Sequence, residues 1–96
     1  MNIISVSDIV ESQQGRDKNK IFVVISVKEG FVFVADGKNR RMESPKRKKQ
    51  KHLALIQRSE SPVAQKLKSG QMTADCEIRR ELAAYRAARE INRGGN

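Results

Sequence analysis

The chain is 96 residues long, which suits one small domain or a smaller domain with an appendage. Its 20 Lys and Arg against 11 Asp and Glu give a formal net charge of +9 at pH 7. An excess of this size favours an anionic partner, nucleic acid ahead of anionic lipid. The single cysteine, Cys76, excludes an intrachain disulfide.

The N-terminal residues lack the basic segment and long apolar core of a secretory signal. No apolar run in the sequence approaches the length that a membrane span needs. Because one cysteine also fits a reducing compartment, we expect a soluble cytoplasmic protein with no membrane partner.

Three short strands are predicted in the first part of the chain. The first covers residues 7–12, and the polar residues 13–20 that follow have turn chemistry, because Gly15 tolerates positive φ. Residues 21–27 and 31–35 are rich in Val, Ile and Phe and are too short for helices. Both segments are apolar on two faces, so each needs cover on both sides.

A hairpin is predicted after the third strand. Asp36-Gly37 suits a two-residue turn with positive φ, so residues 38–42 are expected to form the return strand, which ends before Pro45. A last strand is expected at residues 52–56. Five short antiparallel strands predict a small barrel, closed or partly open, because closure removes exposed strand edges.

The pattern becomes helical from residue 59 onward. Ser61-Pro62 is typical of a helix start, Gly70 of a helix end, and Thr73 predicts a second N-cap. One apolar stripe at helical spacing contains Ala74, Ile78, Leu82 and Tyr85. The late arginines suit the C-terminal end of a helix, and they are Arg86, Arg89 and Arg93.

We assign residues 1–58 to the barrel and residues 59–96 to a two-helix extension packed on it. The helical stripe needs an apolar surface, and the second apolar face of the strands is available. That face contains Phe22, Val24, Val32 and Val34. A dimer interface would satisfy the same need.

A basic turn between two strands is the most specific motif of the chain. Residues 8–12 form an apolar strand, and Gly15 opens the turn. Residues 16–20 are polar or charged, and residues 22–24 belong to the next apolar strand. This arrangement resembles the KOW motif of ribosomal proteins and transcription elongation factors. A second loop glycine, common in that family, is replaced by Asn19, and Asn tolerates left-handed geometry.

The resemblance extends over most of the chain. The matching segments are residues 34–38, 40–41, 45–46, 48–49, 51–53, 73–75 and 77–79. They look like bacterial KOW-domain RNA-binding proteins, which are similar to a class of archaeal and eukaryotic large-subunit ribosomal proteins. The resemblance implies an SH3-like barrel that binds RNA at the ribosome, without catalysis.

A second basic segment, residues 38–52, holds eight Lys and Arg against one acid, Glu43. Charges of one sign repel each other, and phosphate contacts would offset that repulsion; the alternative is a solvated, flexible loop. The predicted RNA-binding residues of both segments are Arg16, Lys18, Asn19, Lys20, Lys38, Arg40, Arg41, Lys46, Arg47, Lys48, Lys49, Lys51 and His52. Gly15 and Gly37 are predicted as structural turn residues.

The four aromatic residues are expected in the core, because three lie in strand patterns and Tyr85 lies on the helical stripe. Binding should then depend on backbone charge and RNA shape rather than on base stacking. One His and one Cys supply no paired metal-ligand spacing, and no nucleophile–base pair is evident. We therefore predict no catalytic residue, no metal and no cofactor.

Three functions remain open at this point. The first is non-catalytic RNA binding, with ribosomal RNA as the target and ribosomal proteins as further partners. The second is a protein–protein adaptor that uses the barrel and the C-terminal helix in translation or transcription complexes. The third is association with duplex DNA. The sequence does not determine the oligomeric state.

Overall fold

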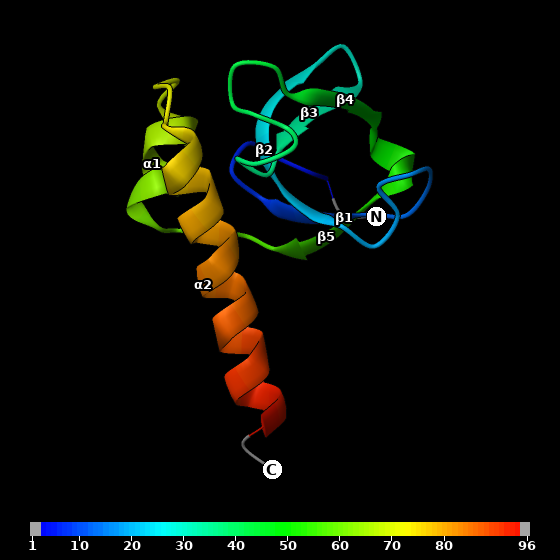
Figure 1. The fold of residues 1–96 in the computed structure, drawn as a ribbon. Coiled ribbons are helices and arrows are strands. Elements are labelled where there is room, and N and C mark those ends of the chain that lie inside the picture. Colours follow the sequence, from blue (N-terminus) through cyan, green and yellow to red (C-terminus); the bar gives the residue numbers. More distant parts are fainter. Residues whose placement is uncertain (1–2, 95–96) are drawn as a thin grey trace.

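The computed structural model describes residues 3–94, with the side chains of residues 3–90. One antiparallel sheet is followed by two helices (Figure 1). The strands are β1 (Ile9–Ser12), β2 (Ile21–Lys28), β3 (Phe31–Ala35), β4 (Lys46–Lys49) and β5 (Leu53–Gln57), with a 3-10 turn η1 (Gln50–His52) before the last. The helices are α1 (Pro62–Lys68) and α2 (Asp75–Gly94). The predicted mainly β fold with a helical C-terminus is confirmed.

The sheet is strongly curled but does not close into a barrel. Its strand order is β4-β3-β2-β1-β5, so the two strands that follow each other in sequence, β4 and β5, form opposite edges. The short turn η1 joins these edges (Figure 1), but within residues 3–94 no strand pairing connects them. A register shift in β2 between Val24 and Ser26 contributes to the bend.

The return strand of the β3 hairpin lies later in the chain than the sequence predicted. Residues 38–42 form no strand, and β3 pairs instead with the basic strand β4. Asp36 Oδ1 accepts the backbone N–H groups of Lys38 and Arg40 at 2.8 and 2.9 Å. This local turn binds the backbone groups that a ladder would need, so pairing resumes only after Pro45.

Two other strand ends are shifted. β1 begins at Ile9 rather than at residue 7, because Ser7 has φ +77° and Asp8 Oδ2 accepts the Ser5 N–H in a turn. β5 begins at Leu53 rather than at residue 52, because η1 ends at His52. Neither shift alters the order of the strands.

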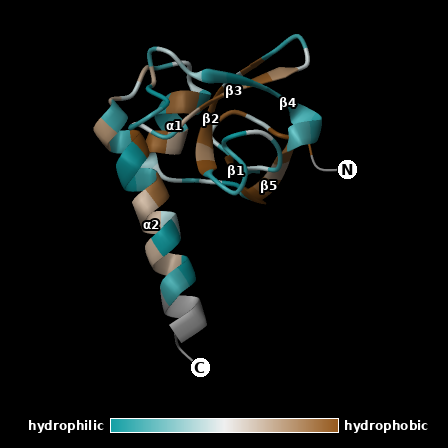
Figure 2. Cartoon of the chain, turned by 45° about the vertical axis from the view of Figure 1, so that its right-hand side comes forward, coloured by the Kyte–Doolittle hydropathy of each residue, from teal (hydrophilic) through white to brown (hydrophobic). Residues whose placement is uncertain are grey.

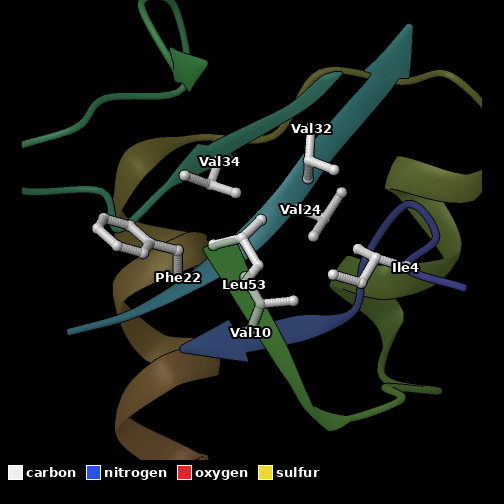
Figure 3. Close-up of a cluster of buried hydrophobic side chains, with 7 residues drawn as sticks. All are labelled: Ile4, Val10, Phe22, Val24, Val32, Val34 and Leu53. Atoms are coloured by element: carbon white, nitrogen blue, oxygen red, sulfur yellow. The ribbon is translucent and has the colours of Figure 1, made fainter. Parts of the chain in front are cut away.

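Two hydrophobic clusters occupy the two faces of the sheet. The inner cluster contains Ile4, Val10, Phe22, Val24, Val32, Val34 and Leu53 (Figure 3). The outer cluster joins Ile9, Ile21 and Val23 of the strands to Leu67, Ile78 and Leu82 of the helices. The helices pack on the sheet as predicted, but on the opposite face. The face that was predicted to bind the helices lies on the inside of the curled sheet, where its side chains pack against one another. The outer face is therefore the one that the helices cover.

The start of α1 agrees with the sequence prediction. Ser61 is its N-cap, and Ser61 Oγ accepts the Ala64 N–H at 3.1 Å, with Pro62 in the first turn. The helix ends at Lys68, and Gly70 follows with φ +83°. Both ends are therefore fixed by local signals that can be read from sequence.

The start of α2 differs from the prediction, because Thr73 is not its cap. The helix begins at Asp75, and Glu77 Oε2 accepts the backbone N–H of Ala74 at 2.8 Å. Thr73 is buried, and its hydroxyl faces Met42 Sδ instead.

Hydrogen bonds from the Lys66 ammonium and then the Ala74 N–H lower the pKa of Glu77 below its ordinary value. The hydrogen bonds of the Glu77 carboxylate therefore stabilise the fold at neutral pH, and this stabilisation is lost as the pH falls and Glu77 is protonated.

Candidate nucleic-acid interface

The β1–β2 loop, residues 13–20, is a compact turn with exposed cations. Gly15 and Asn19 have φ +82° and +73°, so Asn19 adopts the left-handed geometry that the sequence predicted for it. The Lys18 N–H donates to the Gly15 carbonyl at 3.2 Å and closes the turn. Arg16 and Lys18 are exposed on this turn.

A buried carboxylate, Asp17, connects the two basic segments. Its side chain is only 9% exposed and lies among three cations. The distances to its carboxylate are 3.5 Å from Lys48 Nζ, 3.6 Å from Arg40 Nη2 and 3.9 Å from Lys20 Nζ. Asp17 thus holds the β1–β2 loop against the β3–β4 loop and strand β4. From the sequence only the turn chemistry of Asp17 was predicted, because two of its three counterions, Arg40 and Lys48, are distant in sequence.

The basic side chains of strand β4 alternate between the inner and the outer face of the sheet. Lys46 and Lys48 lie opposite residues of the inner cluster, and both are partly buried. Lys48 is 11% exposed, and its Nζ lies 3.3 Å from Ser12 Oγ as well as near Asp17. Arg47 and Lys49 are exposed on the outer face. Residues 46–49 of the second basic segment therefore form a strand rather than part of the solvated, flexible loop that was the alternative, and the charge of Lys48 is neutralised within the protein.

The β3–β4 loop, residues 36–45, is docked on the first turns of α2. Asp75 Oδ1 accepts the Met42 N–H at 2.7 Å, and the Arg79 guanidinium donates to the Gly37 carbonyl. Gly37 has φ +78°, and a Cβ there would collide with the Asp75 carbonyl oxygen and lie 2.9 Å from Arg79 Cγ. The helix therefore fixes the position of the loop, and only glycine fits at residue 37.

A groove of about 520 Å³ lies between the two loops and α2. Its lining residues are Glu11, Asn19, Lys20, Ile21, Asp36, Lys38, Asn39, Tyr85, Arg86, Arg89 and Glu90. Four of these are cations, and one of the three acids, Asp36, already accepts two backbone N–H groups. The groove brings together Asn19, Lys20 and Lys38 from the predicted set.

Arg86 and Arg89 were not among the site residues predicted from the sequence. Both were attributed to the helix dipole, but both line the groove. Their spacing of three places them on one side of a helix, and Arg79, seven residues before Arg86, contacts the β3–β4 loop on that side. This spacing was the available signal. The side chain of Arg93 lies outside the described residues.

The remaining predicted residues lie around this region. Arg41 is exposed on the β3–β4 loop, and Lys51 is exposed on η1. His52 is partly buried, and its carbonyl accepts the Gln13 N–H at 2.8 Å, which places η1 beside the β1–β2 loop. Gly15 and Gly37 both occupy left-handed turn positions, as predicted.

The aromatic residues are not all in the core. Phe22 is fully buried and Tyr85 packs partly against the outer cluster. Phe31 and Phe33 are only partly buried on the outer face of β3, and Arg47 lies 4.7 Å from the Phe31 ring centroid. The prediction is wrong for these two, because α1 and α2 cover the opposite end of that face (Figure 1).

Residues 3–94 form neither a metal-binding cluster nor a membrane-spanning helix. Among the described residues, no group of three or more His, Cys, Asp and Glu could hold a metal ion. The helices of residues 3–94 include none that is long and apolar enough to cross a bilayer.

Compared with family models and with curated proteins, the chain matches none. The resemblance to the KOW family therefore stays a prediction.

We expect Asp17→Asn to destabilise the protein by about 1–3 kcal/mol, although it raises the net positive charge. The amide keeps the shape of the side chain but leaves the mostly buried Lys48 without a counterion. Thermal unfolding of the variant and the wild type measures the loss of stability. The double variant with Lys48→Met should recover part of it, because both charges are then removed. An unfolding midpoint equal to that of the wild type would show that Asp17 does not anchor the loop.

Proposed function

We propose that this chain is a non-catalytic RNA-binding protein that docks structured RNA, with ribosomal RNA as its target, on two basic loops and helix α2. The observation that carries the proposal is the convergence of three separate elements on one groove, which is lined by four cations and three acids. The cations at this groove are Lys20, Lys38, Arg86 and Arg89. Binding at the ribosome follows from the KOW resemblance alone.

The groove cations are held on fixed supports, which favours phosphate binding. The β1–β2 loop is tied to its surroundings by Asp17, and the β3–β4 loop is tied to α2 by Asp75 and Arg79. Fixed loops lose little conformational entropy when they bind a ligand. Phosphate contacts of this kind set the position of a nucleic acid, while the sequence is read elsewhere.

The adaptor alternative is weakened by the packing of α2. The predicted adaptor would use both the barrel and the C-terminal helix, with the apolar stripe of the helix as one partner face. Ile78 and Leu82 are 0% and 1% exposed, because they pack on the sheet of the same chain. The predicted partner face is thus occupied, and the surface that remains around the groove is charged.

A salt titration tests the proposed function. Binding of a folded ribosomal RNA fragment should weaken with salt, with a slope of log K against log salt of about −3 to −4 for four phosphate contacts. A DNA duplex of the same length serves as the control and should bind more weakly. Crosslinking in cells should enrich ribosomal RNA. Salt-independent binding, equal affinity for DNA, or ribosomal RNA at background level would contradict the proposal.

A further inference from the structure

The tip of the β2–β3 hairpin projects away from both helices (Figures 1 and 2). Phe31 and Phe33 lie near this tip on the outer face of β3, two residues apart. In the described part of the chain, neither ring belongs to the inner or the outer hydrophobic cluster. The pair is therefore an aromatic surface that the fold leaves partly open to solvent.

Cations flank this aromatic pair on both neighbouring strands. Lys28 of β2 and Lys49 of β4 lie directly opposite Phe31, and Arg47 of β4 lies directly opposite Phe33. The Arg47 guanidinium also covers the Phe31 ring at 4.7 Å. Two rings and a planar guanidinium thus form one surface, which we name the Phe31–Phe33 platform, with ammonium groups at its edges.

We propose that the Phe31–Phe33 platform stacks unpaired RNA bases. The inference rests on the proposed function and adds a second contact to it, because the groove binds phosphates and the platform binds bases. Aromatic rings and arginine planes are the surfaces on which proteins stack unpaired bases. Lys28 and Lys49 lie where the phosphates that flank a stacked base would need counterions.

The positive charge around the platform favours RNA over a second copy of the chain as the binding partner. A symmetric contact through this face would bring Lys28, Arg47 and Lys49 against the same cations of the other copy, and like charges destabilise such a contact. A nucleic acid supplies the opposite charge together with flat apolar faces. The platform is therefore complementary to the unpaired bases of a single-stranded loop or bulge.

The test compares two RNAs and two variants, one of the exposed ring pair and one of a single buried ring. The probes are an RNA hairpin with a uridine loop and a fully paired duplex of the same stem. Phe31→Leu with Phe33→Leu keeps the apolar volume but removes the flat faces, so the affinity for the hairpin should fall roughly tenfold. The affinity for the duplex should stay unchanged. Phe22→Leu, the same change in the inner core, should lower the unfolding temperature and leave the hairpin-to-duplex ratio unchanged.

Each outcome decides the inference. A selective loss on the hairpin supports it, and equal affinities of the double variant and the wild type for both RNAs overturn it while leaving the proposed function intact. Failure of the wild type to bind either RNA overturns both. A second measurement needs no variant: 5-iodouridine in the loop should photo-crosslink to Phe31 or Phe33 of the wild type. Crosslinks confined to other segments would overturn the stacking site.

Discussion

Neutralising three groove cations, by Lys38→Gln with Arg86→Gln and Arg89→Gln, is expected to weaken RNA binding by roughly 100-fold. The physical reason is the loss of three charge-assisted contacts to phosphates, one from the β3–β4 loop and two from α2. The slope of log K against log salt should become shallower by about 3. Fluorescence anisotropy over a salt series measures both quantities.

A charge-matched control separates a localised interface from general attraction. Lys66→Gln with Lys68→Gln and Arg80→Gln removes the same number of positive charges from exposed positions of α1 and α2 that do not line the groove. Lys66 and Lys68 are exposed, so losing their ion pairs with the partly buried Glu77 and with Glu60 should cost only a small part of the stability. An equal loss of affinity in both variants would mean that net charge alone drives binding, and the groove assignment would be wrong.

Reversing all four charges of β4 would be a less informative experiment. Lys48 is bound to Asp17 and Ser12 inside the protein, so a glutamate there would place two carboxylates together in a mostly buried position. The variant would lose stability, and any loss of RNA binding would follow from unfolding. The test therefore belongs on exposed cations at the groove.

The parts of the fold that sequence predicted are those fixed by neighbours along the chain. The apolar strands β2 and β3 and the cap at Ser61 each depend on a few adjacent residues. The left-handed geometry of Asn19 belongs to the same class, since its short side chain tolerates positive φ wherever it stands. Such signals need no knowledge of tertiary contacts.

The parts that sequence did not predict depend on residues far apart in the chain. Lysines are depleted in strands, so β4 is not evident from composition, and its pairing follows from the open edge of β3. The continuous apolar run of β2 indicates two buried faces but not which of them the helices cover. The cations around Asp17 come from three elements, and their convergence requires the curled sheet.

Gly37→Ala is expected to destabilise the protein by roughly 3–5 kcal/mol, a large share of the stability of a small domain. The new Cβ would be strained at φ +78° and would also collide with the Asp75 carbonyl oxygen. That oxygen belongs to the backbone of α2, so it cannot rotate away as a side chain would. The unfolding midpoint should fall by roughly 20 °C.

Gly15→Ala is the matched control, because it separates backbone strain from the contact with α2. Gly15 has a similar φ of +82°, but an added Cβ there meets nothing within 4 Å. Only the strain remains, about 1 kcal/mol, and calorimetry should show a much smaller shift than for Gly37→Ala. Gly37→Ala should in addition weaken RNA binding below its unfolding midpoint, because the loop that carries Lys38 would leave the groove. Equal destabilisation by the two substitutions would show that backbone conformation, rather than close packing on α2, makes glycine necessary at residue 37.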